Sequence, residues 1–411
     1  MKIKIQGAAS VLTATCLSLW FALPLFAREN QPSSSVASQY DFAPVRAYIQ
    51  KTLAEKQLPS VSVAVAKNGK TIWEESFGWA DREKMIPATP ETIYALASLT
   101  KPYTSTGVLE LVEEHKIDLD APINQYLGSA PITAIVGDAS GATVRRVLCH
   151  TSGLPIHSAN LFGNGEQIPP MADVIRRYGV LVNPPGRYFN YSNLGYGVLA
   201  YMTSLVARLD WKDYMRDKVF LPLGLLHTSV GIGPGLEPYA AARYDNQNRR
   251  LSPFAADAPG ASAIWASAHD VVRFGMFQLK DHLPDQQRIL SDTTFDLMKK
   301  SATGGVPSAG TMLGQKSYGL GWFIEPDDHG YTVGPSGWRQ FAPFTYDHHS
   351  KFGAVPGPGP RLRGSIRRAR QFRQPSKQSG VAASHASRLQ KTSCPARIMP
   401  PSPYPQRRGR P

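Results

Sequence analysis

The sequence predicts an α+β fold, in which an antiparallel sheet is flanked by helices and interrupted by a helical insert. Three observations support this prediction. A strand–turn–strand pattern occupies residues 61–77, and two further strand patterns occur near residues 318–324 and 331–333. Between them, residues 116–250 show helical patterns joined by loops that are rich in Pro and Gly. Strands at both ends of a domain, with helices between them, favour a sheet that both ends close.

The first predicted elements are an amphipathic helix and a β-hairpin. Residues 43–56 show the helical spacing of apolar side chains, which predicts a helix with one buried face. That face would contain Val45, Tyr48, Ile49 and Leu53. Residues 61–66 then alternate between polar and apolar, residues 71–77 form a second strand pattern, and Asn68-Gly69 between them is a strong hairpin signal.

The next element is a Ser-x-x-Lys sequence at the predicted start of a helix. Residues 97–102 read Ala-Ser-Leu-Thr-Lys-Pro, and an apolar run follows at residues 108–112. A helix places Ser98 and Lys101 on the same face as neighbours. A serine hydroxyl needs an adjacent base to become a nucleophile, and burial lowers the pKa of a lysine enough to make it that base. The helix N-terminus also favours a developing oxyanion.

A Ser-x-x-Lys match alone is weak evidence, because a chain of this length contains roughly one or two by chance. A candidate partner is Tyr191-Ser192-Asn193, which precedes a predicted helix. Its tyrosine could pass a proton to a leaving group near an ammonium, and Asn193 could hold the lysine or a substrate amide. Tyr188-Phe189-Asn190 and Tyr244-Asp245-Asn246 share the spacing. We set the latter aside as a polar loop, whereas the residues alone leave Tyr188 open.

Residues 148–155, Leu-Cys-His-Thr-Ser-Gly-Leu-Pro, predict a helix end followed by a turn. His150 is predicted to be structural, capping a carbonyl. Cys149 follows an apolar helical pattern, so we predict that it is a small core residue. Its spacing from Cys394 indicates no disulfide framework. The sequence shows neither metal-ligand spacing nor a phosphate loop, so no cofactor is expected.

Three motifs occur in order along the chain: Ser98-Leu-Thr-Lys101, His150-Thr-Ser-Gly-Leu-Pro155 and Tyr191-Ser-Asn193. Together they resemble the serine β-lactamase-related family, which groups class C β-lactamases, penicillin-binding DD-peptidases, carboxylesterases and D-amino-acid peptidases. The resemblance covers residues 40–334. It implies a β-lactamase/transpeptidase-like fold and a small-molecule or peptide acyl substrate.

The resemblance also implies roles for individual residues. Ser98 would be the acylated nucleophile, and its backbone N–H would form half of the oxyanion hole. Lys101 would be the base, or one of two bases, for acylation. Tyr191, which the resemblance favours over Tyr188, would carry a proton to the leaving group and later help activate water. Asn193 would bind substrate, a role that only some members give it.

The sequence departs from the family after Tyr331-Thr-Val-Gly334. There the family has a third motif, Lys/His-x-Gly, on the strand that lines the site, whereas this chain has Pro335-Ser336-Gly337-Trp338. Proline cannot donate to a sheet ladder, and the basic side chain is absent. Residues 335–411 are rich in Pro and Arg, a composition that cannot bury a core. We therefore predict a disordered basic tail and missing C-terminal strands.

A one-base frame change near Gly334 would explain this departure. Codons for Pro335-Ser336-Gly337-Trp338, read one base later, permit His-Pro-Gly-Gly. The same shift turns Asp347-His348-His349 into codons that mostly encode Ile or Thr, which are typical of a strand. The alternative is a genuine tail. In either case we predict that this exact chain is poorly folded or inactive, because losing one oxyanion donor typically costs about 10²–10³ in rate.

The N-terminus predicts export. Lys2 and Lys4 precede an apolar stretch at residues 8–26, which indicates a signal peptide over residues 1–27. Pro24 interrupts that stretch and favours cleavage over a membrane anchor, which needs about 20 unbroken apolar residues. Residues 28–39 form a polar, Ser-rich lead-in. We therefore expect a periplasmic or secreted protein with no stable membrane span after cleavage.

Charge is distributed unevenly along the 411 residues, whose formal net charge is +14. From Gly337 onward there are 15 Lys and Arg residues and one acid, Asp347, so the rest carries 30 basic and 30 acidic residues. The body is therefore neutral, and its 42% hydrophobic content supports a real core. A basic tail can bind polyanions, but nucleic acid is not an expected partner of an exported protein.

These observations favour an exported serine hydrolase that forms an acyl-enzyme on an ester, amide or β-lactam. A second hypothesis is a non-catalytic binder of cell-wall peptides or penicillins with the same fold. The absent third motif favours the binder, whereas the intact Ser98, Lys101 and Tyr191 favour the enzyme. The motifs determine the chemistry and leave the acyl group open, because specificity would come from the helical insert, including residues 160–171.

Overall fold

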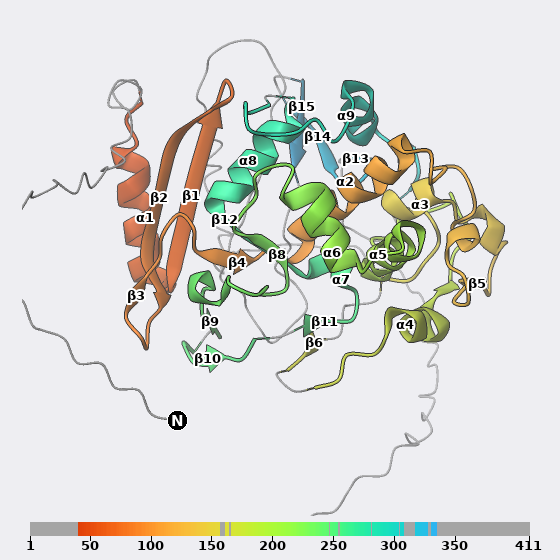
Figure 1. Ribbon diagram of the computed structural model, residues 1–411, viewed down its shortest axis with the longest axis horizontal. Coiled ribbons are helices and arrows are strands. Elements are labelled where there is room, and N and C mark those ends of the chain that lie inside the picture. Colours follow the sequence, from red (N-terminus) through yellow and green to blue (C-terminus); the bar gives the residue numbers. More distant parts are fainter. Residues whose placement is uncertain are drawn as a thin grey trace, which may run out of the picture. The chain divides into compact units, whose positions relative to one another are not determined.

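The computed structural model describes residues 40–156, 161–163, 166–245, 247–253, 255–280, 282–303, 305–307, 317–327 and 330–334 (Figure 1). All of them belong to one compact unit. The predicted signal peptide, the lead-in and the tail after Gly334 lie outside the described residues, as does Cys394.

The predicted hairpin is confirmed. Strands β1 (Ser60–Lys67) and β2 (Lys70–Asp81) pair antiparallel, and β3 (Ile86–Pro87) adds to the far edge of β2. Asn68 and Gly69 both have positive φ, at 51° and 68°, as a two-residue type I′ turn requires. The hairpin lies between α1 (Ala43–Lys56) and α8 (Ala268–Gln278) (Figure 1).

Alternation along β2 explains this packing, since successive side chains point to opposite faces. Glu75 accepts from the guanidinium of Arg46 in α1 at 2.7 Å, whereas the neighbouring Glu74 lies 3.0 Å from His269 Nδ1 in α8. The helix over residues 43–56 is thus confirmed, but its predicted buried face is wrong at Tyr48, which is 57% exposed. None of the α1 side chains is fully buried.

The helical part is built around α2 (Thr100–Glu113) and α5 (Asn193–Ala207), which pack against each other and against α7 (Pro259–Ser262). Further helices surround them: α3 (Val144–Leu148), α4 (Met171–Tyr178), α6 (Trp211–Met215) with the π-helical turn η5 (Arg216–Phe220), and α9 (Asp292–Lys299). Short 3₁₀ turns are η2 (Ala97–Leu99), η3 (Ile123–Tyr126), η4 (Ala139–Gly141) and η6 (Glu237–Tyr239). Cys149 is buried, as predicted.

A small central sheet lies between the hairpin and the helical part. In it β12 (Ile264–Ser267) lies between β4 (Ile93–Ala95) and β8 (Thr228–Val230), antiparallel to both. Three strand pairs are peripheral: β5 (Thr133–Ala134) with β7 (Val180–Leu181), β6 (Leu161–Phe162) with β11 (Ala255–Ala256), and β9 (Arg243–Tyr244) with β10 (Arg250–Leu251).

The C-terminal strands depart from one prediction. Residues 318–324 were expected to form a single strand, but β13 (Ser317–Tyr318) and β14 (Phe323–Asp327) pair antiparallel across a turn. Gly321, with φ 93°, allows that turn. A Cβ there would meet Ser105 Oγ at 2.4 Å, so the turn packs directly on α2. The strand expected at residues 331–333 is confirmed within β15 (Gly330–Gly334).

The hairpin and the C-terminal strands form separate three-stranded sheets among the described residues. There β15 pairs only with β14, and β1 pairs only with β2, so each sheet ends on an unpaired edge. The described strands alone therefore do not form the single closed sheet that we expected.

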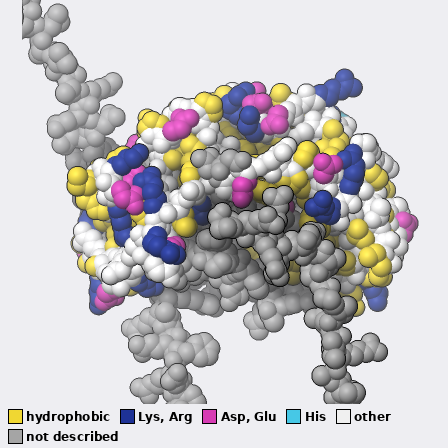
Figure 2. Space-filling model, turned by 90° about the horizontal axis from the view of Figure 1, so that it is seen from below, with side chains coloured by type: hydrophobic (Ala, Val, Ile, Leu, Met, Phe, Trp, Pro, Cys, Tyr) yellow, Lys and Arg dark blue, Asp and Glu magenta, His cyan; other side chains and the backbone are white. Residues whose placement is uncertain are grey.

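The surface of the described residues carries both signs of charge. Figure 2 shows Lys and Arg side chains interspersed with Asp and Glu, in keeping with the balanced charge before Gly337. In the part of the chain that the structure describes, no helix has the length and apolar character needed to cross a bilayer.

Candidate active site

The site begins where β4 leads into α2. Leu96 N–H donates to the carbonyl of Ile264 in β12 at 2.8 Å, and the 3₁₀ turn η2 then carries Ser98 into the first turn of the helix. Ala97 has φ 49°, a left-handed conformation that costs a non-glycine residue about 1–2 kcal/mol. Backbone strain of this kind clusters at functional sites. Here it lies directly before the candidate nucleophile.

Lys101 is one helical turn after Ser98, and its side chain is fully buried. Its Nζ lies 3.1 Å from Ser98 Oγ, 2.9 Å from Asn193 Oδ1 and 3.1 Å from the carbonyl oxygen of Ala261. None of these three partners is a carboxylate. Burial therefore lowers the pKa of Lys101 well below its ordinary value, because the interior disfavours the ammonium.

The arrangement of these partners determines what a neutral Lys101 can do. A neutral amine has two N–H donors and one lone pair. Asn193 Oδ1 and the Ala261 carbonyl can only accept, so they take both donors. The lone pair then faces Ser98 Oγ, whose hydroxyl can donate to it. This is the geometry of a base that removes the serine proton.

Tyr191 lies beside Ser98 and Lys101. Its side chain hydrogen-bonds that of Ser98, and Lys101 Nζ lies 4.7 Å from the centre of its ring. We expected a neighbouring ammonium to ease ionisation of this tyrosine, but burial instead raises its pKa. Tyr191 is thus protonated and can donate.

The alternative tyrosines lie elsewhere. Tyr188 is 39% exposed, and the hydroxyl of Tyr244 accepts from the backbone N–H of Arg82 at 2.9 Å. The structure therefore brings Ser98, Lys101, Tyr191 and Asn193 together. Sequence reasoning missed the Ala261 carbonyl, because a backbone acceptor on a short helix leaves no residue-type signal.

The loop that follows α3 holds the Tyr191-Ser192-Asn193 segment in place. His150 Nδ1 accepts from Ser192 N–H at 3.0 Å, and the Pro155 carbonyl accepts from Ser192 Oγ at 2.6 Å. The Ile156 carbonyl accepts from Asn193 N–H at 3.1 Å. His150 is therefore structural, but the prediction that it caps a carbonyl is wrong, since its ring accepts a hydrogen bond.

Gly153, at the centre of this loop, offers a test of how tightly the loop is packed. It has φ 91°, and an added Cβ would lie 2.1 Å from the carbonyl oxygen of Asn183. We expect Gly153→Ala to lower the free energy of unfolding by clearly more than about 1 kcal/mol, as measured by urea denaturation. Gly235→Ala is the matched control, because Gly235 also has positive φ, 83°, but open space around it. Equal losses in the two variants would contradict this packing.

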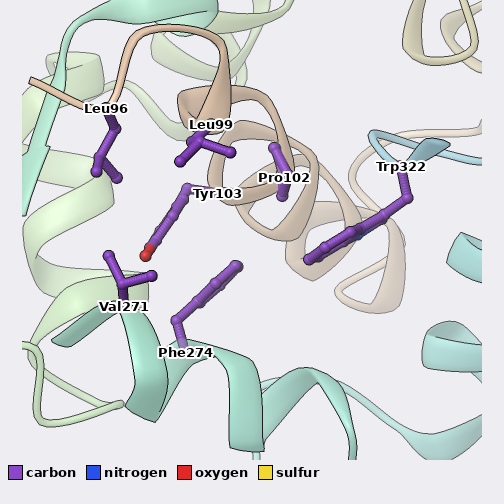
Figure 3. A pocket seen from close by; sticks show the side chains of 7 residues that line it. All are labelled: Leu96, Leu99, Pro102, Tyr103, Val271, Phe274 and Trp322. Carbon is purple, nitrogen blue, oxygen red and sulfur yellow. The ribbon is translucent and has the colours of Figure 1, made fainter. Parts of the chain in front are cut away.

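A small apolar cavity lies between α2, α8 and the turn that precedes β14 (Figure 3). It is lined by Leu96, Leu99, Pro102, Tyr103, Val271, Phe274 and Trp322. Residues 101 and 103 point to opposite sides of a helix, so this cavity is separate from the Lys101 cluster. Among the described residues, no group of three or more His, Cys, Asp or Glu side chains could hold a metal ion.

The fold and the Ser98 cluster define a serine β-lactamase/transpeptidase-like protein. The chain belongs to the Beta-lactamase family, whose model matches residues 45–357 and so extends past Gly334. Similar proteins include PbpX of Bacillus subtilis (strain 168), which is named as a penicillin-binding protein and is 26% identical over 78% of this chain and 81% of its own. Protein flp of Staphylococcus aureus (strain MRSA252) is 26% identical over 68% of this chain, which spans only 55% of flp.

A solved structure shares the fold. The octameric penicillin-binding protein homologue from Pyrococcus abyssi superposes with a TM-score of 0.58 over 73% of this chain and 68% of its own, at 24% identity.

Proposed function

We propose that this protein is an exported serine hydrolase that forms an acyl-enzyme on Ser98 and cleaves an ester, amide or β-lactam bond. One observation carries the proposal. Lys101 is buried, and its Nζ lies within 3.1 Å of Ser98 Oγ, Asn193 Oδ1 and the Ala261 carbonyl. In the neutral form that burial favours, the two N–H donors go to Asn193 and Ala261, and the lone pair is left for Ser98 Oγ. Membership of the Beta-lactamase family supports the same chemistry.

The reaction would proceed in two halves. Lys101 takes the Ser98 proton while Oγ attacks the carbonyl carbon, and the Ser98 backbone N–H, in the first turn of the helix, faces the oxyanion. As the intermediate collapses, Tyr191 gives its proton to the leaving group and recovers one from the Lys101 ammonium. Water then attacks the acyl-enzyme with the same groups acting in reverse.

We propose that the protein acts in the periplasm or after secretion, on a small-molecule or peptide acyl substrate and without a cofactor. The predicted signal peptide at residues 1–27 supports this location. Asn193, which contacts Lys101 and borders the nucleophile, would also bind the substrate.

The test is covalent labelling of the full chain with a fluorescent penicillin, followed by mass spectrometry of the labelled peptide. An adduct on the peptide that contains Ser98 would support the proposal, and it would overturn the prediction that this exact chain is inactive. A panel of aryl esters then measures turnover. A chain that is folded, by its circular dichroism, and acquires no adduct from penicillin or ester would refute the proposal.

The alternative function is non-catalytic binding of cell-wall peptides or penicillin, and the third-motif position favours it. Pro335-Ser336-Gly337-Trp338 supplies no basic side chain there. Such a binder would retain reversible affinity for a muropeptide when Ser98 is replaced by alanine, and it would hydrolyse no ester. Turnover that depends on Ser98 would exclude it.

The pH dependence of acylation tests the role of Lys101. Because burial lowers the pKa of this lysine, the reactive neutral form should prevail well below the ordinary lysine pKa of about 10.4. We expect the labelling rate constant, measured from about pH 5 to pH 10, to rise through a midpoint far below 10.4 and then level off. Lys101→Arg, which stays charged, should be unreactive throughout. A midpoint near that of free lysine would contradict this assignment.

A further inference from the structure

His150 is a buried titratable side chain to which the proposed reaction assigns no step. It is 1% exposed and follows α3 with φ 61°, a left-handed conformation. Its ring centre lies 4.4 Å from that of Tyr191 and 4.8 Å from that of Tyr318. His150 therefore lies, in a strained backbone conformation, beside the tyrosine to which the proposed reaction assigns a proton transfer.

The hydrogen bonds of His150 determine its tautomer. Nδ1 accepts from Ser192 N–H, so this nitrogen carries no proton. The proton is therefore on Nε2, which is buried and has no hydrogen-bond partner among the described residues. An unsatisfied buried N–H costs about 1–3 kcal/mol, which a residue that only fills space would avoid.

The backbone of His150 also hydrogen-bonds the segment that contains Tyr191. Its carbonyl accepts from Asn190 N–H at 2.8 Å, while its ring accepts from Ser192 N–H at 3.0 Å. Tyr191, the residue between these two contacts, therefore has peptide groups held on both sides by one histidine. Ser192 is also the N-cap of α5, so the hydrogen bond from Ser192 N–H to His150 helps to fix the position of Asn193 at the start of the helix.

We propose that His150 is a positioning residue, whose Nδ1 acceptor holds Tyr191 and Asn193 in register with Ser98 and Lys101. The inference rests on the proposed function and deepens it. A charged imidazole would carry a proton on Nδ1 and would lose this acceptor. Burial lowers the pKa of His150, so the neutral ring prevails.

The acceptor position can be tested with three substitutions. The Oδ1 of asparagine lies as many bonds from Cβ as Nδ1 of histidine, so His150→Asn keeps an acceptor in place. His150→Gln places its acceptor where Nε2 was, and His150→Phe retains a ring without any acceptor. Comparing the three separates the acceptor from the volume of the ring.

The experiment measures two quantities on the full chain: the rate constant for labelling of Ser98 by fluorescent penicillin, and hydrogen exchange of the Ser192 amide. We expect His150→Phe and His150→Gln to label about 10²-fold more slowly, because a misplacement near 1 Å costs about that much. Their Ser192 amide should exchange faster. His150→Asn should recover most of both losses, and melting temperatures show which variants are folded.

Each outcome has a distinct meaning. Labelling and exchange unchanged in a folded His150→Phe would overturn the positioning role, and so would an Asn variant as impaired as Phe. If the unsubstituted chain is not labelled at all, the proposed function fails. The exchange of the Ser192 amide then still decides whether the Nδ1 acceptor holds this segment.

Discussion

Replacing Ser98 with alanine is expected to abolish acyl-enzyme formation. No other described serine or threonine hydroxyl hydrogen-bonds Lys101 Nζ, so none can take the place of Oγ at this base. Removing the nucleophile of a serine hydrolase lowers kcat by about 10⁶-fold. Ester turnover should fall to the background rate, and mass spectrometry should find no adduct on the peptide that contains residue 98.

A control variant separates this effect from general damage to α2. Ser105 lies two helical turns after Ser98, and its hydroxyl is buried 3.3 Å from that of Tyr196. Ser105→Ala should therefore keep its labelling rate. Labelling that persists in Ser98→Ala would place the nucleophile elsewhere. A loss of labelling in both variants would indicate a damaged helix and not a missing nucleophile.

The sequence was sufficient wherever a local rule determined the structure. Asn68-Gly69 required a tight turn, and the alternation on either side then placed β1 and β2 in one hairpin. The three-residue spacing of Ser98, in η2, and Lys101, in α2, brought them within hydrogen-bonding distance, as helix geometry dictates. These features depend on residues that are close in the chain.

The sequence was insufficient where long-range contacts decided. Residues 318–324 had a strand pattern, but the close approach of Gly321 to Ser105 turns them into a hairpin. The partner of His150 is a backbone N–H 42 residues away, which no local pattern encodes. Tyr48 follows the helical spacing of its neighbours yet is exposed, since helical spacing does not encode how much of the helix its neighbours cover.

The second prediction with a large expected effect concerns the residues after Gly334. There β15 ends with β14 on one side only, and β1 has an unpaired edge among the described strands. We propose that the reading frame changes by one base near this point. The alternative frame permits His-Pro-Gly-Gly, followed by strand-forming residues. These residues could extend both sheets and supply the missing side of the site.

Expression of the alternative frame is therefore expected to raise the labelling rate constant by about 10²–10³ relative to this chain, the typical effect of one oxyanion donor. It should also raise the urea concentration at the unfolding midpoint, because more apolar surface is buried. A third chain that stops after Gly334 is the matched control. It distinguishes a gain from the restored strands from a gain due to loss of the basic tail.

The first measurement is the DNA sequence across the codons for Thr332 to Pro358 from an independent source. A base added or lost there, together with faster labelling of the restored chain alone, would support the frame change and the active hydrolase. If the frame is unchanged and all three chains label equally, the tail is genuine and the restored motif is irrelevant to acylation. Ser98, Lys101 and Tyr191 would then have to suffice for acylation without the restored motif.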